Sequence, residues 1–430
     1  MKAIIHSSTA GVLAVALLAL AACSTKQEAA SEDMDSAEPA SPTATSHLYT
    51  QTNETDNSII HYGRMADGTL TEMDRVATGG KGTNGFKPAT GEESAPDTLL
   101  SAYAVTMSRD HRWLFNVNAG DQSVSAFKVG ADGHLSLTDT EATGEKAPPS
   151  SVAFDDKTQT LYVMHTLGPN HIRSFKLQDG NLVANEKSYT LNYDKFDNRV
   201  ATSIVVSPDG RFLLADVLFN APPAAGPDGP KLTPSNAGNP DGLVVFPITS
   251  DGSLGDPVLN DAGAPTPFSL AFLRGSNTQF VNTFAAGNGA VLSTLAADGT
   301  VSNGPLATVD LSLAPNGPSE SCWVSISPDN SHAFVTNFGL GNLTSFSISG
   351  DTLTSANGSL GLVEGDGKFM AFAGIPTSGP NDSWASEDGF LYQLYPNAST
   401  LIAYRIEGKD LAEVGRYPIP YNSPSGLAGF

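Results

Sequence analysis

Cysteine is almost absent from this chain of 430 residues: Cys23 and Cys322 are the only two. Such a chain has no disulfide framework, so its fold must be stable through a large apolar core. Cys322 lies in the apolar stretch Cys322–Ile326, and no motif places a histidine beside it. This setting is typical of a small buried hydrophobe and not of a nucleophile.

Basic residues are also scarce. The chain has 23 Lys and Arg against 45 Asp and Glu, which gives a formal net charge of −22. So acidic a surface repels nucleic acid and anionic lipid headgroups, which argues against both as direct partners. It is compatible with a small-molecule ligand or with a partner in the cell envelope.

Most of the familiar catalytic signatures are missing. The chain has no Gly-x-Ser-x-Gly elbow, Walker loop, His-Glu-x-x-His, Cys-x-x-Cys or Asp-x-Asp-x-Asp-Gly calcium loop. Helical periodicity is nearly absent after residue 22. We therefore expect no cofactor, no metal ion and an all-β fold.

The only long apolar run is Gly11–Ala22, which follows Met1-Lys2 and precedes Cys23. A basic start and a short apolar core predict a signal peptide over residues 1–22, too short to span a membrane stably. Leu20-Ala21-Ala22-Cys23 resembles the lipobox of bacterial lipoproteins, which implies lipidation at Cys23. By the same resemblance Ser24 favours the outer membrane, with the protein facing the periplasm or the surface. The alternative is an ordinary signal peptide with an incidental cysteine.

Residues 23–45 contain Ala, Ser, Thr, Pro, Glu and Asp with almost no large apolar side chain. Such a segment cannot bury enough surface to offset its ordering entropy. It therefore predicts a flexible acidic tether ahead of a globular domain over residues 46–430.

A short cassette recurs in that domain: an apolar strand, a Ser-x-Asp turn, a second apolar strand and a third strand. The turn is clearest at Ser108–Arg112, Ser207–Arg211 and Ser327–Asn330. The second strand aligns seven times, centred on Leu48, Leu114, Leu161, Leu213, Gln279, Ala333 and Leu391. Self-similarity at this spacing predicts a seven-bladed β-propeller.

The first copy lacks a leading strand, because only the tether precedes it. Residues 423–430 look like a leading strand with nothing after them. We expect this C-terminal strand to complete the first blade and close the ring, which leaves no long unpaired edge. The domain is then a single closed unit, which we expect to be monomeric.

The sequence Ser-Pro-Asp-Gly-Arg, followed by an apolar strand ending in Asp or Asn, resembles the seven-bladed lactonase-like propellers. That family includes the 6-phosphogluconolactonases and carboxymuconate cyclase-like proteins. The resemblance implies that the leading strand of each blade is innermost. It also implies that ligands bind at the channel mouth formed by the loops entering that strand and the loops joining strands two and three.

Antiparallel strands reverse at each turn, so these two sets of loops share one face and the Ser-x-Asp turns lie on the other. We call them the insertion face and the turn face. Three long insertions, residues 76–97, 218–241 and 362–380, all belong to the insertion face. Long loops on one rim of a rigid scaffold commonly shape a binding site. The alternative is neutral variation in exposed loops.

Lactone opening needs a base or activated water and a donor for the developing oxyanion. The resemblance implies Pro-His-x-His or Gly-Pro-Arg-His leading into the innermost strand, and this chain has neither. The charged residues in those positions are Arg199, Glu320 and Asp382. Arg199 is a candidate to hold a carboxylate or phosphate, and Glu320 is a candidate base. A charge in such a position is more often a solvated rim charge or a local ion-pair partner.

His165 and His171 form a histidine pair on the insertion face. A histidine there is a candidate acid or base, and the spacing fits no common zinc arrangement. The candidate catalytic residues are therefore Glu320, His165 and Arg199. The candidate binding residues are His171, Asp382, Ser321 and Asn381.

Two functions remain open at this stage. The first is hydrolysis of a small lactone or related hydroxy acid at the channel mouth. The second is a non-catalytic envelope propeller that binds a protein, glycan or peptide on its insertion face, and the missing histidine motifs favour it. A purely structural envelope role is a third possibility.

Overall fold

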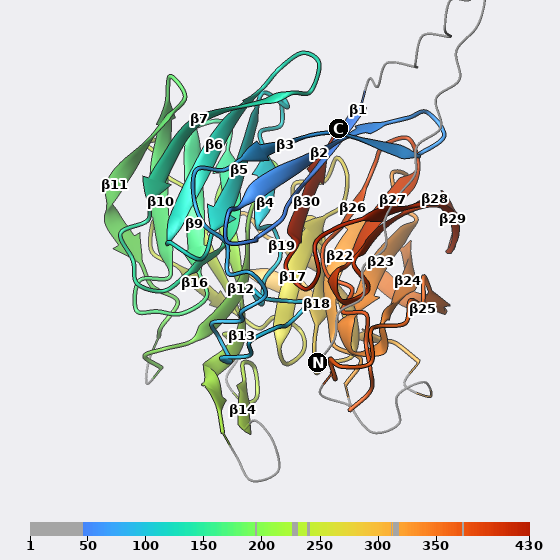
Figure 1. The fold of residues 1–430 in the computed structure, drawn as a ribbon. Coiled ribbons are helices and arrows are strands. Elements are labelled where there is room, and N and C mark those ends of the chain that lie inside the picture. The colour runs from blue at the N-terminus through green and yellow to red at the C-terminus, as the bar shows by residue number, and fades with distance from the viewer. Residues whose placement is uncertain are drawn as a thin grey trace, which may run out of the picture. The chain divides into compact units, whose positions relative to one another are not determined.

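Seven antiparallel sheets succeed one another along the described chain, each with the strand order of a propeller blade (Figure 1). The computed structural model describes residues 46–193, 196–225, 231–238, 241–310, 312, 318–371 and 374–430. The predicted signal peptide, Cys23 and the tether at 23–45 lie outside these residues. In the described part of the chain, no helix combines the length and hydropathy needed to cross a membrane.

The innermost strand of each blade is the leading strand of the sequence cassette. From blade 1 to blade 7 these strands are β30 (Ser425–Gly429), β4 (Val105–Met107), β8 (Pro149–Asp155), β12 (Val200–Val206), β17 (Pro267–Phe272), β22 (Ser321–Ile326) and β26 (Ser383–Ala385). Each contacts the next, and β30 contacts both β26 and β4. The innermost strands therefore form a closed ring.

The remaining strands follow outward in each blade. In blades 1 to 3 they are β1 (Ser46–Gln51), β2 (Ser58–Arg64), β3 (Leu70–Ala77); β5 (Trp113–Asn118), β6 (Ser123–Val129), β7 (Leu135–Ala142); and β9 (Thr160–His165), β10 (Ile172–Gln178), β11 (Asn181–Tyr189). In blades 4 and 5 they are β13 (Phe212–Ala224), β15 (Leu243–Pro247), β16 (Val258–Asn260), with β14 (Lys231–Pro234) paired to β13; and β18 (Gln279–Phe284), β19 (Gly289–Leu295), β20 (Val301–Asn303), with β21 (Ala307–Thr308) paired to β19. In blades 6 and 7 they are β23 (His332–Asn337), β24 (Asn342–Ser349), β25 (Thr352–Leu360); and β27 (Phe390–Tyr395), β28 (Thr400–Glu407), β29 (Asp410–Pro418). Two 3₁₀ turns, η2 (Phe338–Leu340) and η3 (Pro396–Ala398), follow β23 and β27.

The C-terminal strand closes the first blade, as the sequence predicts. Strand β30 pairs antiparallel with β1, placing Leu48 opposite Gly429. His47 and Phe430 exchange two backbone hydrogen bonds of 2.9 and 3.0 Å at the end of this pair. Figure 1 shows the C-terminus beside β1. The first and last segments of the domain are thus held in one sheet.

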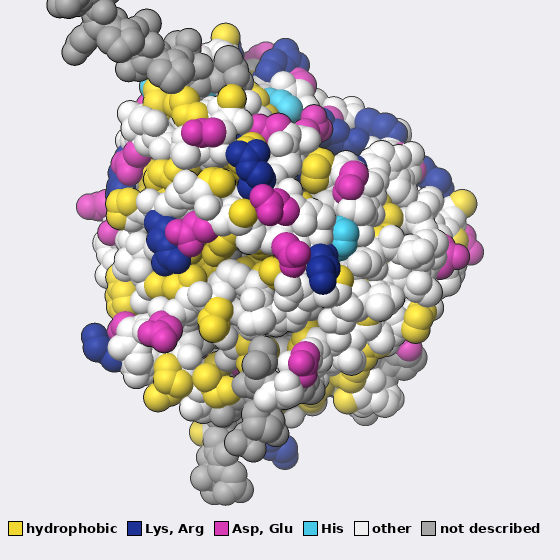
Figure 2. All heavy atoms as spheres, turned by 90° about the vertical axis from the view of Figure 1, so that its right-hand side faces the viewer, with side chains coloured by type: hydrophobic (Ala, Val, Ile, Leu, Met, Phe, Trp, Pro, Cys, Tyr) yellow, Lys and Arg dark blue, Asp and Glu magenta, His cyan; other side chains and the backbone are white. Residues whose placement is uncertain are grey.

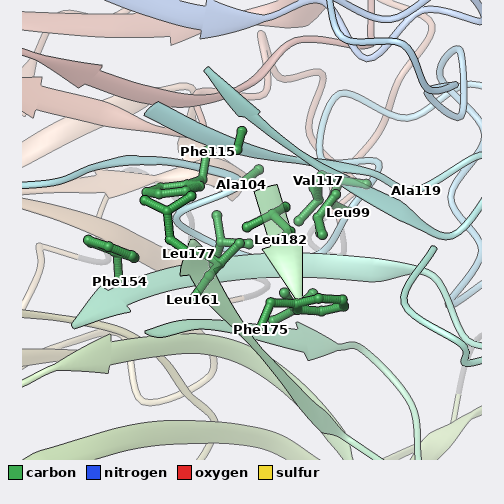
Figure 3. Packing of buried hydrophobic residues seen from close by; sticks show 14 residues of the cluster. Leu99, Ala104, Phe115, Val117, Ala119, Phe154, Leu161, Phe175, Leu177 and Leu182 are labelled. Carbon is green, nitrogen blue, oxygen red and sulfur yellow. The ribbon is translucent and has the colours of Figure 1, made fainter. Parts of the chain in front are cut away.

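Burial falls from the innermost strand to the outermost one. Every residue of β8 and β22 is buried, whereas β3 alternates mostly between exposed and half-buried positions. Apolar side chains from neighbouring blades pack between them, as in the cluster of Figure 3, where the rings of Phe115 and Phe154 stack with centroids 4.7 Å apart. Fully burying each such side chain contributes roughly 1.5–3 kcal/mol. Blade-to-blade packing therefore replaces the missing disulfides.

The Ser-x-Asp cassette is a hydrogen-bonded turn between the innermost strand and the next. Ser207 Oγ donates to Asp209 Oδ1 at 2.7 Å, and the N–H of Phe212 donates to Ser207 Oγ at 3.0 Å. The fourth position has positive φ, 64° at Gly210 and 58° at Asn330. Gly and Asn tolerate this conformation, so the cassette encodes its own turn.

Charges of both signs share the surface. Figure 2 shows Lys and Arg side chains interspersed with Asp and Glu on the face that it presents. Interspersed charges weaken the field of the net negative charge close to that face.

Candidate functional site

The segment that leads into β4 does not stay on the rim but enters the channel. We call residues 97–104 the plug. Its hydrogen bonds reach the innermost strands, or the residue before them, in five other blades: Ser101 Oγ to Ser150 O (2.6 Å), Ala102 N to Thr202 O (2.9 Å), Tyr103 Oη to Leu270 O (2.7 Å), Trp323 Nε1 to Ser101 O (3.0 Å) and Tyr103 N to Asp382 Oδ1 (3.3 Å). The plug is thus tied to blades 3 to 7 at once.

Apolar side chains seal the plug against the ring. Leu100 and Ala102 belong to one buried cluster with residues from blades 4, 5 and 6, including Phe268 and Trp323. Leu100 and Tyr103 have positive φ of 49° and 64°. Such conformations cost on the order of 1–3 kcal/mol each and persist only where the surroundings over-determine them. The ring of hydrogen bonds supplies that constraint.

The expected channel mouth on the insertion face is occupied by the plug in this structure. The loop predicted to surround the mouth continues into it and fills it with buried backbone and apolar side chains. The physical reason is that seven innermost strands leave a channel whose polar backbone groups need partners, and the plug supplies them. A separate cavity of about 560 Å³ lies on this face away from the plug, lined by residues 362–364, 398–400 and 416–418.

Arg199 lies at the start of the innermost strand of blade 4 with its side chain wholly buried. Its Nη2 donates to Asp241 Oδ1 at 3.0 Å, and its Nε donates to Asn220 Oδ1 at 3.1 Å. Burial lowers the pKa of Arg199 and Asp241 opposes that change. Arg199 thus holds both ends of the insertion between β13 and β15.

His165 and His171 are also fully buried. His171 Nδ1 accepts from the N–H of Leu191 at 3.1 Å, so its Nε2 carries the proton and donates to Arg199 O at 2.9 Å. His165 Nδ1 lies 3.3 Å from His171 O. Burial lowers the pKa of both histidines to about 4. Both rings are therefore neutral near pH 7 and lie in the wall of the fold.

Glu320 belongs to a different cluster. It is 6% exposed, has a φ of 53°, and interacts electrostatically with Lys87, whose Nζ donates to Asp97 Oδ2 at 2.7 Å. Burial raises the pKa of the neighbouring Cys322 thiol well above its usual range, with Glu320 adding to the shift. The sequence prediction of a buried, unreactive cysteine agrees with this position.

The three predicted binding residues Ser321, Asn381 and Asp382 are buried and bonded within the protein. Ser321 Oγ donates to Asn337 Oδ1 at 2.9 Å, and Asn381 Nδ2 donates to Pro424 O at 2.9 Å. Asp382 accepts from two backbone N–H groups, and burial raises its pKa to about 6. None of the seven predicted site residues lines a cavity described below, so their functional roles stay predictions.

A cavity of about 590 Å³ opens on the turn face. We call it the turn-face cavity. Tyr103 of the plug lines it, together with the last residues of the innermost strands of blades 5, 6, 7 and 1. Its charged and titratable side chains are Arg64, His111, Arg274, Glu387 and Asp388. A smaller cavity of about 300 Å³ shares Tyr103, Ala271 and Phe272 with it.

The two arginines of the turn-face cavity differ in how many of their side-chain donors have hydrogen-bond partners. Arg64 is buried, and it donates to Asp388 Oδ1 at 2.6 Å while its guanidinium lies 5.2 Å from the Trp384 ring centroid. Arg274 is half-buried and donates from Nη2 to Ala385 O at 2.5 Å, but its buried Nε has no hydrogen-bond partner among the described residues. Burial lowers the pKa of Arg274, and the nearby Glu387 opposes that change. Arg274 is therefore a cation in the wall of the turn-face cavity.

His111 is the residue that sequence reasoning missed. It occupies the fourth position of the first cassette with a φ of 57°, where the other two have Gly210 and Asn330. Its ring stacks on Phe430 with centroids 4.8 Å apart and planes inclined by 15°. The sequence signal for His111 was a histidine at a turn position where the other cassettes have Gly or Asn. Residues with strained backbones cluster at functional sites, so such a residue is a candidate site residue.

The comparisons with known proteins agree with the fold. Residues 39–165 match the family model described as "Lactonase, 7-bladed beta-propeller". The comparison with curated proteins finds no match.

Several solved structures share the architecture. A protein from Bacteroides fragilis NCTC 9343, provisionally assigned as a 6-phosphogluconolactonase, aligns with a TM-score of 0.65 at 16% identity, over 91% of this chain and 100% of its own. The periplasmic gluconolactonase of Pseudomonas aeruginosa aligns with a TM-score of 0.62 at 16% identity, over 89% of this chain and 98% of its own. A protein from Lactobacillus plantarum aligns with a TM-score of 0.62 at 16% identity, over 90% of this chain and 99% of its own. The described domain is thus a seven-bladed β-propeller, and residues 39–165 of the chain are similar to the lactonase propeller family.

Proposed function

We propose that the protein hydrolyses a small lactone and that the substrate binds in the turn-face cavity. The observation that carries the proposal is one cavity lined by a half-buried arginine, a carboxylate and an imidazole: Arg274, Glu387 and His111. The volume of about 590 Å³ lies within the usual range for small-molecule sites. The similarity of residues 39–165 to the lactonase family supports lactone hydrolysis as the reaction class.

The reaction adds water across the ring ester. Glu387 or His111 accepts a proton from water, and the resulting hydroxide oxygen attacks the carbonyl carbon. The guanidinium of Arg274 stabilises the oxyanion that develops, as hydrogen-bond donors do in acyl transfer. The ring C–O bond then breaks and the leaving oxygen takes the proton back, which yields the open hydroxy acid.

Aromatic side chains favour a substrate with an apolar face. Trp384, Phe272 and Phe430 line the same cavity as the arginines. Arginine recognises carboxylate and phosphate. We therefore propose a lactone that carries a carboxylate or phosphate group.

The test is turnover of sugar lactones and lactonised muconates by the purified mature chain. Arg274→Gln should lower kcat/KM by about 100-fold, the usual effect of removing one oxyanion donor. Arg405→Gln is the matched control, because Arg405 is exposed on the outer part of blade 7. Turnover that is equal in both variants and the wild type would exclude Arg274, and no turnover of any lactone would exclude the reaction.

A second function is favoured by one specific observation. Phe86, Leu362, Met370 and Tyr421 are exposed on loops of the insertion face. Hydrogen bonds join these loops, Asn422 Nδ2 to Ser94 Oγ at 2.9 Å and Tyr421 Oη to Asp366 Oδ2 at 2.7 Å. Exposed apolar side chains on an ordered surface are typical of protein contacts. A non-catalytic envelope propeller that binds a protein here would turn over no lactone, and Leu362→Asp with Met370→Asp would abolish its cross-link to that partner.

We also propose that Cys23 is lipidated and that residues 23–45 tether the propeller to the outer membrane. The periplasmic location in the printed name of the Pseudomonas aeruginosa gluconolactonase supports an envelope location. Mass spectrometry of the mature N-terminal peptide tests this directly. A Cys23→Ser variant recovered in the membrane fraction as fully as the wild type would contradict it.

A further inference from the structure

Three side chains from two blades meet beside the ring closure. His61 is in β2, Asp74 faces it across the strand pair in β3, and His134 is in the turn between β6 and β7 of blade 2. Asp74 Oδ1 lies 3.1 Å from His61 Nδ1, and Asp74 Oδ2 lies 2.6 Å from His134 Nδ1. One potential ligand atom from each of the three residues lies within 4.8 Å of the others.

The surroundings hold two of these groups in place. His61 Nε2 is 2.9 Å from His47 Nδ1, a hydrogen bond that sets the orientation of the His61 ring. Tyr49 stacks on the same ring with centroids 4.9 Å apart. The Tyr49 hydroxyl donates to Gly133 O at 2.7 Å, which fixes the turn that carries His134. Second contacts of this kind orient metal-binding histidines in proteins.

Exposure is graded across the cluster. The His61 side chain is fully buried, Asp74 is 32% exposed and His134 is 45% exposed. An ion can therefore reach the cluster from the His134 side. Tetrahedral zinc with Zn–N bonds of about 2.0–2.1 Å places its ligand atoms roughly 3.3 Å apart, so the three side chains, whose ligand atoms lie within 4.8 Å of one another, move closer on binding.

We propose that His61, Asp74 and His134 bind a divalent transition-metal ion, best Zn²⁺, which joins blade 1 to blade 2 beside the ring closure. Imidazole nitrogens with one carboxylate suit Zn²⁺ and neighbouring transition ions, whereas Mg²⁺ and Ca²⁺ prefer oxygen ligands. Three protein ligands leave a fourth position for water or a ligand donor. The bound ion stabilises the folded ring, because it binds the native state and not the unfolded chain.

The competing interpretation is a hydrogen-bonded His-Asp-His chain with no ion. Isothermal titration of the EDTA-treated mature chain with ZnCl₂ separates the two. We expect one Zn²⁺ per chain, with micromolar or tighter affinity, a raised melting temperature and no comparable response to MgCl₂ or CaCl₂. Co²⁺ in place of Zn²⁺ should give the absorption bands of a four-coordinate site. The absence of saturable Zn²⁺ binding would overturn the proposal.

Matched variants assign the ligands. His134→Ala changes a side chain that is 45% exposed, and it should weaken Zn²⁺ binding at least 10-fold, as should Asp74→Asn. His332→Ala is the control, because His332 bonds to Ser331 in blade 6 and lies outside the cluster. Equal Zn²⁺ affinity in His134→Ala and the wild type would overturn the assignment.

Discussion

The carboxylate of Asp382 joins the plug to the closing strand. One oxygen accepts from the backbone N–H of Tyr103 at 3.3 Å, and the other accepts from the backbone N–H of Gly426 at 2.8 Å. Residues 103, 382 and 426 belong to blades 2, 7 and 1. The same side chain thus connects the segment that fills the channel with the strand that completes the ring.

Tyr103 should contribute to stability through its ring more than through its hydroxyl. Tyr103→Phe loses the bond to Leu270 O and should cost about 1 kcal/mol. Tyr103→Ala also removes a half-buried ring, and we expect it to cost roughly 2–4 kcal/mol. Urea denaturation of both variants measures the difference. An unchanged midpoint in Tyr103→Ala would show that the plug does not stabilise the ring.

Arg199 and Asp241 should behave as a buried ion pair. Arg199→Met or Asp241→Asn leaves the other partner without its counter-charge, which typically costs about 3–5 kcal/mol. We expect both variants to lose stability alike, as measured by chemical denaturation. If Arg199→Met stays fully folded but selectively loses lactone turnover, Arg199 is catalytic and the structural interpretation fails.

Asp216 should make the fold less stable as the pH rises. Burial raises its pKa to about 7, while the unfolded chain ionises near about 3.9. Between these values the unfolded state releases a proton that the folded state keeps, so stability is lost as the pH increases through this window. Asp216→Asn should therefore raise the melting temperature relative to the wild type at pH 8 and not at pH 4. Melting curves across this range check it, and a difference independent of pH would contradict it.

Gly426, at the ring closure, and Gly408, on the outer rim of blade 7, allow a matched comparison of glycine substitutions. Both have positive φ, 76° and 65°. A Cβ on Gly426 would lie 2.5 Å from the backbone nitrogen of Val105, whereas a Cβ on Gly408 meets nothing within 4 Å. Gly408→Ala should cost about 1 kcal/mol from backbone strain alone. Gly426→Ala should cost clearly more, and equal unfolding midpoints would mean that β30 can shift.

The fold was predictable because its determinants are local. Ser207, Asp209 and Phe212 make the turn within six residues, and the pattern repeats along the chain. The pairing of the C-terminal strand with β1 was also predictable, because the first blade lacked a leading strand and residues 423–430 formed a strand that belonged to no other blade. Neither step needed a long-range contact.

The site was not predictable in the same way. Arg199 occupies a position that family resemblance makes functional, yet its charge is neutralised by Asp241, 42 residues away. The zinc candidates His61 and His134 belong to different blades and share no motif spacing. The sequence shows which residues carry reactive or metal-binding side chains, but only the folded structure shows which of them lie close enough to act together.

The Ser-x-Asp cassette, by itself, determined the number of blades, the closing strand and the two faces, because each depends on local hydrogen bonds repeated at a regular spacing. The tertiary structure alone decided that residues 97–104 enter the channel and that Tyr103 lines a cavity on the turn face. Hydrogen bonds from the plug to five blades favour that path over an exposed loop. No segment of sequence contains those partners, which come together only when the ring has closed.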